Sequence, residues 1–376
     1  MIRLAQVIET FEADFLAQYR DRLSAEHLRA LAAIRQCRTH ASPKIELQCP
    51  QCEHRSLVPH SCGHRHCPHC QHHDSQQWLQ RQLQRQVPAA YFLLTFTLPA
   101  EFRALARAHQ QRIYDLLIGC AWQSVHTFSR NDRHLQGTPG AIAVLHTNTR
   151  RLDYHPHVHL VMPAAAIDAD RKRWRTQRSG RAKARYLFNH KALAKVFRAK
   201  MLAGIEAAGL ALPPRHPGTW VVDCKSVGSG EKALVYLGRY LYRGVIREQD
   251  IVACANGQVS FRYRDAKTGR IERRTVCGAH FLWLVLQHVL PKGFRRARNF
   301  GFLHPNSKRL IALLHVLLKF TPPALPATIR QRAPVLCACC GAVMTILRTR
   351  LPPLFCAGTP LPVPLPVPAT GSALSV

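Results

Sequence analysis

Six of the fourteen cysteines in this 376-residue chain lie between Cys37 and Cys70. The segment from Cys37 to about His73 has few periodic apolar residues, so it has little core of its own and needs a metal ion to hold a shape. It contains two Cys-x2-Cys pairs separated by 14 residues, a spacing that can close a tetrahedral thiolate site. We therefore predict a zinc ion bound by Cys49, Cys52, Cys67 and Cys70.

Other cysteines leave further metal sites open. Cys37, Cys62 and His66 lie beside the predicted set, and a second zinc ion or none fits them equally well. Cys337-x2-Cys340 is half of a zinc ribbon, with Cys356 further on but no second Cys-x2-Cys. This half fits a vestigial or shared site as well as a functional one. Disulfides are disfavoured because residues 1–15 lack an apolar signal core, so we expect an intracellular, reducing environment.

The charge balance indicates the partner. Lys and Arg number 53 against 21 Asp and Glu, a formal charge of +32. Such an excess repels itself unless a polyanion is bound, and nucleic acid is the commonest large polyanion. An anionic membrane is the rival partner, but the sequence has no basic amphipathic helix of that kind and no run of 18 apolar residues. We expect a nucleic-acid-binding protein.

Periodicity predicts helices and strands in mixed order. Helical patterns cover 1–35, 101–130, 191–210 and 231–243. Strand patterns cover 91–98, 141–147, 155–162 and 220–227, and a hairpin is expected over 259–276. This order favours an α+β fold with an antiparallel sheet. We divide the chain into a helix and Cys/His segment (1–85), a central domain (86–310) and a C-terminal region with a Pro-rich tail (311–376).

The strand HPHVHLVM places His155, His157 and His159 at alternate positions. Alternate residues of a strand project from the same face, so the three imidazoles stand in a row. Two neighbouring imidazoles can bind one divalent ion and leave coordination positions open for a substrate phosphate. A polar strand face without metal is the equal alternative, because the chain has 22 histidines.

The helix EKALVYLGRYLYR carries Tyr236 and Tyr240 four residues apart, hence on one face. A phenol titrates near pH 10 and is a poor nucleophile unless its target is polarised, for example by a nearby metal ion. Arg239 and Arg243 lie between and beside the tyrosines and suit a face turned toward phosphates. Ordinary packing of the tyrosines is the alternative.

A basic run begins after residue 168. Its Arg and Lys side chains can follow a phosphate backbone, and an aromatic ring among them can stack on a base. The candidate DNA-binding residues here are Arg171, Lys172, Arg173, Trp174 and Arg175. A solvated loop without a specific role fits the same run.

Taken together, HPHVH and the later YLGRY resemble the HUH (histidine–hydrophobe–histidine) nucleases, specifically the two-tyrosine rolling-circle transposases of the insertion sequence 91 family. HSCGHRHCPHCQ (60–71), YFLLTFTLP (91–99), WVVDCKSV (220–227) and LPKGFRRARNFGF (290–302) extend the resemblance over roughly residues 27–305. It implies a ferredoxin-like (RNA-recognition-motif-like) catalytic sheet preceded by a zinc-binding domain.

The resemblance also implies the chemistry. His157 and His159 would bind Mg²⁺ or Mn²⁺, and Tyr236 and Tyr240 would attack DNA, each leaving a 5′ phosphate esterified to the tyrosine. The partners would be single-stranded transposon ends and target DNA, in the bacterial cytoplasm at the nucleoid. The family's metal site needs a third ligand, which cannot be identified from this sequence. His155 is a candidate by its place on the strand alone.

Three rival functions remain. A replication initiator or conjugative relaxase would use the same HUH chemistry without the preceding zinc module. A zinc-containing DNA-binding regulator would carry the histidines as structural residues. A metal-dependent hydrolase would nick DNA with water and form no covalent protein–DNA adduct.

Overall fold

The computed structural model describes residues 2–70, 72–168, 170, 172–176, 187–242, 244–324 and 334–352. They form two compact units: Met1–Cys37 with Cys62–Ala333, and Arg38–Ser61 with Pro334–Val376. Over the described ranges, the helices all fall short of the length and apolar character that crossing a bilayer requires. The units are not consecutive in the chain, so the division differs from the three successive segments expected from the sequence.

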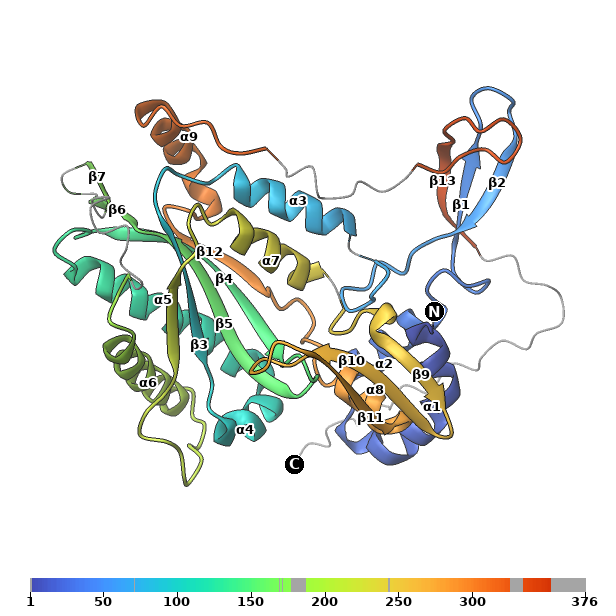
Figure 1. The fold of residues 1–376 in the computed structure, drawn as a ribbon, viewed down its shortest axis with the longest axis horizontal. Coiled ribbons are helices and arrows are strands. Elements are labelled where there is room, and N and C mark those ends of the chain that lie inside the picture. The colour runs from blue at the N-terminus through green and yellow to red at the C-terminus, as the bar shows by residue number, and fades with distance from the viewer. Residues whose placement is uncertain are drawn as a thin grey trace, which may run out of the picture. The chain divides into compact units, whose positions relative to one another are not determined.

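The first unit is built around an antiparallel sheet, which has the strand order β7-β6-β4-β5-β3-β8, with β12 also paired to β4 (Figure 1). Its strands are β3 (Tyr91–Thr97), β4 (Thr138–Asn148), β5 (Tyr154–Pro163), β6 (Ala165–Asp168), β7 (Arg173–Thr176), β8 (Val222–Ser226) and β12 (Ala297–Gly301). The helices that pack on it are α4 (Arg103–Ala108), α5 (Gln110–Asn131), α6 (His190–Ala207), α3 (His72–Leu83), α7 (Glu231–Tyr242) and α9 (Lys308–Leu317).

The order β3-α5-β4-β5-α6-β8 is a β-α-β-β-α-β unit, and its strands lie in the spatial order β4-β5-β3-β8. This is the ferredoxin-like arrangement, so the expected α+β fold is confirmed. Side chains alternate between the two faces of the sheet along β5, and this decides which residues can face the candidate site. Val158 and Leu160 point into a core with α5 and α6, whereas Val161 shares the opposite face with α3 and α7. Figure 1 shows α3 and α7 side by side on that second face.

The N-terminal helices α1 (Leu4–Tyr19) and α2 (Ala25–Gln36) do not form a domain with the cysteine segment alone. Their buried residues, such as Phe11 and Phe15, pack with α8 (Gly278–Leu286), and with β9 (Ile251–Ala255), β10 (Gln258–Arg264) and β11 (Ile271–Cys277). The β10–β11 hairpin lies where the sequence predicts one. Apolar faces far apart in the sequence thus build one core.

The second unit contains a separate three-stranded sheet. β1 (Lys44–Gln48) pairs with β2 (Arg55–Pro59) on one side and with β13 (Thr345–Leu351) on the other, both antiparallel. Its apolar core is small, because only Leu47, Cys49, Cys337 and Met344 form its buried cluster among the described residues.

Gly301 closes β12 against β4, and it has a left-handed φ of 57°. A Cβ added there would lie 1.7 Å from the carbonyl oxygen of Pro139, so Gly301→Ala must separate the two strands. Strain and lost pairing should cost at least about 2 kcal/mol. We expect a fall of several degrees in the melting temperature, measured by tryptophan fluorescence. Gly119→Ala on α5 is the control, since its Cβ would meet nothing within 4 Å and should leave the melting temperature unchanged or slightly raised.

Candidate functional site

Three histidines meet on the sheet face covered by α7. His157 and His159 come from β5, and the antiparallel register places His146 of β4 opposite His157. The ring centroid of His146 lies 4.3 Å from that of His159 and 5.2 Å from that of His157. The ring centroids of His157 and His159 are 4.9 Å apart. One ring nitrogen from each histidine lies within 4.8 Å of the others. This is a group of ligands that one metal ion can bridge.

His146 supplies the third ring nitrogen of this group, a position that the sequence left open. The ring of the candidate His155 lies 5.3 Å from that of His157. Its Nδ1, however, accepts a hydrogen bond of 2.9 Å from Arg103, and His155 does not belong to the described group. The sequence does contain a signal for His146: it shares its strand face with Ile142 and Val144 and is the polar residue of that apolar alternation. Only the strand register shows that this face meets His157.

Burial keeps these imidazoles neutral. It lowers the pKa of His157 to about 4 and that of His159 to about 3, and it holds the pKa of His146 well below its usual range. The Nδ1–H of His157 donates to the carbonyl of His155 at 2.7 Å, which leaves Nε2 with its lone pair. The hydroxyl of Thr95 hydrogen-bonds the Nδ1 of His159 at 3.0 Å.

The residues present fit a divalent cation. The Nε2 of His146 is buried and has no hydrogen-bond partner among the described residues, an arrangement that costs free energy unless another group is bound there. Neutral imidazoles oriented by partners on their other nitrogen are the usual ligands of such an ion.

Helix α7 places both tyrosines beside the histidines. Leu234, Leu237 and Leu241 anchor the helix in the core, and this fixes the tyrosines over the sheet. The ring of Tyr240 stacks on that of His146, with centroids 3.3 Å apart and planes 12° apart. The ring of Tyr236 lies 6.1 Å from both His146 and His159.

The two phenols differ in their surroundings. The Tyr240 hydroxyl donates to Oδ1 of Asn148 and accepts the backbone N–H of Thr147 at 3.1 Å. The Arg296 guanidinium lies 4.6 Å from the centroid of the same ring. Tyr236 is 50% exposed, and its hydroxyl has no hydrogen-bond partner among the described residues. Partial burial raises the pKa of Tyr236, so the phenol is protonated at neutral pH.

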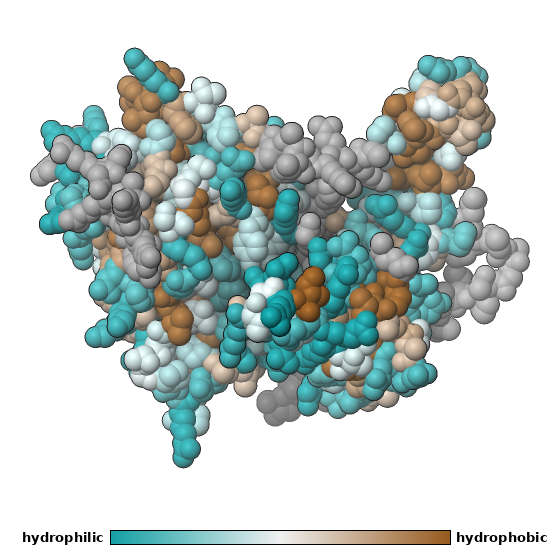
Figure 2. Space-filling view, in the orientation of Figure 1, coloured by the Kyte–Doolittle hydropathy of each residue, from teal (hydrophilic) through white to brown (hydrophobic). Residues whose placement is uncertain are grey.

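A pocket of about 1040 Å³ opens onto this group. Its basic lining residues come from α7, from the β4–β5 loop, from the β10–β11 hairpin and from the segments before β9 and β12: Arg150, Arg151, Arg239, Arg247, Arg262, Arg264, Lys267 and Arg296. The acids Asp153, Asp250 and Asp265 also line it, so the excess charge is positive. Figure 2 shows hydrophilic residues gathered over β10 and β11. Arg239 lies where it was expected, whereas the contribution of the hairpin was missed.

The predicted basic run contributes no lining residue to the described pocket. The Trp174 ring packs edge-on against Phe302 at 5.4 Å, and Arg175 pairs with Asp168 at 3.3 Å. Lys172 and Arg173 are exposed. Arg171 and Arg243 lie outside the described residues. The Trp174 ring is partly buried against Phe302, so this contact occupies one of its edges rather than leaving the whole ring open for stacking.

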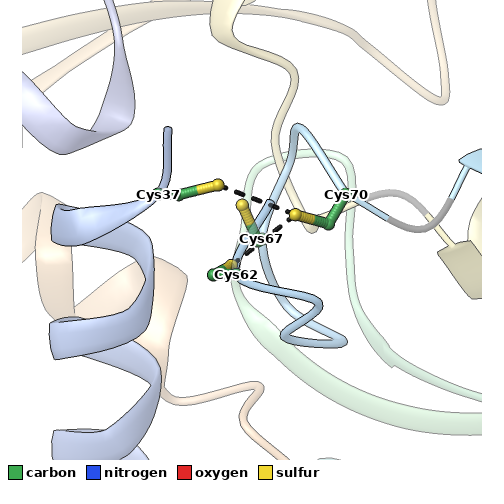
Figure 3. A group of neighbouring side chains, drawn as sticks. All are labelled: Cys37, Cys62, Cys67 and Cys70. Atoms are coloured by element: carbon green, nitrogen blue, oxygen red, sulfur yellow. Dashed lines mark hydrogen bonds between the residues drawn. The ribbon is translucent and has the colours of Figure 1, made fainter. Parts of the chain in front are cut away.

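The cysteines group differently from the expected set. In the first unit the group consists of Cys37, Cys62, Cys67 and Cys70 (Figure 3). Cys37 lies at the end of α2, and Cys67 and Cys70 lie on the loop before α3. The Sγ atoms of Cys37 and Cys62 are each 3.6 Å from that of Cys70. In the second unit Cys49 and Cys52 meet Cys337 and Cys340. The spacing within each Cys-x2-Cys pair fixes a local turn, but it does not fix which pairs meet.

His66 lies apart from both groups. Its Nε2 accepts the backbone N–H of Leu290 at 3.2 Å, and burial lowers its pKa well below the usual range. This hydrogen bond joins the loop before α3 to the segment after α8. His66 is not a member of either cysteine group.

Two family models and one solved structure are similar to parts of this chain. Residues 140–310 match a family model described as "Putative transposase", and residues 7–98 match a "Transposase zinc-binding domain". The conjugative relaxase TrwC, solved in complex with mutant OriT DNA, aligns at 18% identity and a TM-score of 0.26 over 35% of this chain and 48% of that one.

Two curated relatives are closer in sequence. The transposase for insertion sequence element IS801 of Pseudomonas savastanoi pv. phaseolicola is 28% identical over 71% of this chain and 65% of its own length. The "Putative transposase y4qJ" of Sinorhizobium fredii is 32% identical over 80% of each chain. With both domain models matched and most of each length aligned, this chain belongs to the insertion sequence 91 family of transposases.

Proposed function

We propose that the protein is a DNA transposase that nicks and rejoins one strand through a covalent tyrosine–5′-phosphate intermediate. The observation that carries the proposal is the placement of two tyrosines against three grouped histidines: Tyr240 stacked on His146, and Tyr236 beside His146 and His159. The basic pocket supports DNA as the substrate, because its guanidinium groups can follow a phosphate backbone. Family membership favours transposition over replication initiation or conjugation.

His146, His157 and His159 would hold a Mg²⁺ or Mn²⁺ ion. When bound, the ion would polarise the scissile phosphate and offset the charge that develops on the leaving oxygen. The other contributions come from the chain itself. Arg239 and Arg296 line the pocket and can hold the phosphate backbone in place, and the helix fixes the phenols at a set distance from the histidines.

The chemical step exchanges one ester for another. The phenol oxygen attacks phosphorus, the bond from phosphorus to the 3′ oxygen breaks, and the phenol proton leaves as the 3′ hydroxyl gains one. The phosphate stays esterified to the tyrosine, so the bond energy is retained. A free 3′ hydroxyl can then reverse the step and rejoin a strand without ATP.

We assign the first attack to Tyr236. Tyr236 is half-exposed and lines the pocket, whereas the hydroxyl of Tyr240 is held by Asn148 and Thr147 beside His146. Tyr240 would act second, once its hydrogen bonds to β4 are exchanged. Two nucleophiles allow one strand to be held while another is cut.

We also propose that Cys37, Cys62, Cys67 and Cys70 bind one structural zinc ion. Their four sulfurs can fill all positions of a tetrahedral ion, which leaves none open for catalysis.

The histidines are tested by substitution with alanine. His146→Ala, His157→Ala and His159→Ala should each lower nicking of a single-stranded oligonucleotide carrying the element's end by about 10²-fold or more. DNA binding should change little, because it depends on Lys and Arg contacts with phosphates. Mn²⁺ binding, measured by isothermal titration calorimetry, should be lost with nicking.

His155→Ala is the matched control, since it lies on the same strand but turns toward Arg103. It should keep both nicking and Mn²⁺ binding. If the three variants lose DNA binding and nicking to the same degree, the histidines hold the fold rather than an ion.

The tyrosines are tested with Phe variants, which remove a hydroxyl and leave the ring packed. Tyr236→Phe should slow formation of the covalent adduct on the labelled oligonucleotide, and Tyr240→Phe should keep it. The double variant should form no adduct and still bind DNA, as seen on a denaturing gel and by mobility shift. Tyr263→Phe, another pocket residue, should behave like the unaltered protein.

An adduct in the double variant would place the nucleophile elsewhere. Nicked DNA without any adduct in the unaltered protein would identify water as the nucleophile and reject the transposase mechanism.

Removal of the first cysteine group should be visible in the metal content. Cys67→Ala should lower the zinc measured per chain by one ion and lower the melting temperature, because the loop before α3 loses its metal. Cys277→Ser, an exposed cysteine outside both groups, should change neither. Zinc content equal to that of the unaltered protein in Cys67→Ala would contradict this ligand set.

A further inference from the structure

The second cysteine group joins two segments from distant parts of the chain. The Sγ of Cys49 lies 3.4 Å from that of Cys340, and the Sγ of Cys52 lies 3.6 Å from those of Cys337 and Cys340. A tetrahedral zinc ion with Zn–S bonds of about 2.3 Å has sulfur–sulfur edges of about 3.8 Å. A disulfide needs about 2.05 Å. The separations are therefore those of ligands around one ion rather than of a covalent bond.

The two Cys-x2-Cys turns have the same backbone hydrogen bonds. In each, the first cysteine N–H donates to the carbonyl five residues on: Cys49 to His54 at 2.9 Å, and Cys337 to Ala342 at 2.8 Å. The carbonyl of the same cysteine accepts the N–H four residues on, from Glu53 at 3.1 Å and from Gly341 at 3.0 Å.

The match extends to the sulfur and to the backbone angle. The N–H two residues after the first cysteine donates to its Sγ at 3.4 Å in both turns, from Gln51 and from Cys339. The residue after the second cysteine has a left-handed φ in both, 57° at Glu53 and 73° at Gly341. Two turns of unrelated sequence share four features, and in each the N–H groups are directed at the sulfur of a ligand. Such turns are built to present two thiolates to one ion.

The small unit needs such an ion. Two of the four residues in its buried apolar cluster are themselves the cysteines Cys49 and Cys337. A sheet of three short strands with so little core is too small to be stable by apolar burial alone, and units of this size usually depend on disulfides or metal.

We propose that Cys49, Cys52, Cys337 and Cys340 bind a second, structural zinc ion in a zinc ribbon assembled from two distant segments. The C-terminal Cys-x2-Cys is then the second half of the site whose first half lies at residues 49–52. All four positions are filled by sulfur, so the ion has no catalytic position. This proposal is independent of the assigned nucleophiles, whereas the expected zinc counts also include the ion proposed for Cys37, Cys62, Cys67 and Cys70.

The test measures zinc per chain in full-length protein by mass spectrometry after gel filtration. The unaltered protein should carry two zinc ions. Cys52→Ser and Cys340→Ser should each carry one, although the two residues lie 288 positions apart. Cys339→Ser is the matched control: its cysteine lies between the two ligands of the C-terminal turn, is exposed and is not in the group, so two ions should remain.

Two ions in Cys340→Ser, or one in Cys339→Ser, would overturn the proposal. Since loss of a ligand can also unfold the small unit, a second measurement uses the unaltered chain. Co²⁺ added to metal-free protein should give a thiolate-to-cobalt absorption that saturates at two ions per chain. Saturation at one ion, with a band that Cys67→Ala abolishes, would overturn the second site, because the single ion would then be bound by Cys37, Cys62, Cys67 and Cys70.

Discussion

The antiparallel pairing of β4 with β5 is the interaction on which the candidate active site depends. It sets His146 opposite His157 and Val144 opposite His159, so one face of two strands carries all three imidazoles. A slip of one residue would turn His146 to the face packed by α5 and α6 and replace it by an apolar side chain. The register is held because both faces of this central sheet are buried, and a slip would send apolar residues of one core into the other.

The same sheet explains what could be predicted from the sequence. The helix–strand order, the row of histidines on β5 and the shared face of Tyr236 and Tyr240 follow from local periodicity, and the structure places them together. His146 could not be assigned, because its role depends on the pairing of two strands rather than on any spacing within one. The cysteines repeat this lesson: each Cys-x2-Cys turn is local, but Cys67 meets Cys37 and Cys49 meets Cys340 through contacts that span the chain.

Charge is distributed less simply than the basic run suggests. The chain carries a formal charge of +32, yet most cations of the pocket beside the histidines come from the β4–β5 loop, from α7 and from the β10–β11 hairpin. Residues such as Arg262 and Arg264 project from a strand whose other face carries Phe261 into the core. A run of basic residues in the sequence does not show where charge gathers in the fold, whereas alternation on a strand concentrates charge at one edge of a cavity.

The pairing of β1 with β13 has a consequence for biosynthesis. β1 and β2 are made early, but the strand that completes their sheet begins at Thr345, and 285 positions separate Cys52 from Cys337. At about 5–20 residues per second, the ribosome needs roughly 15–60 seconds to make that interval. During this time the first hairpin is on a nascent chain with one open strand edge and two unpartnered thiols. The order of translation thus leaves the small unit to form last, after the central sheet has been synthesised.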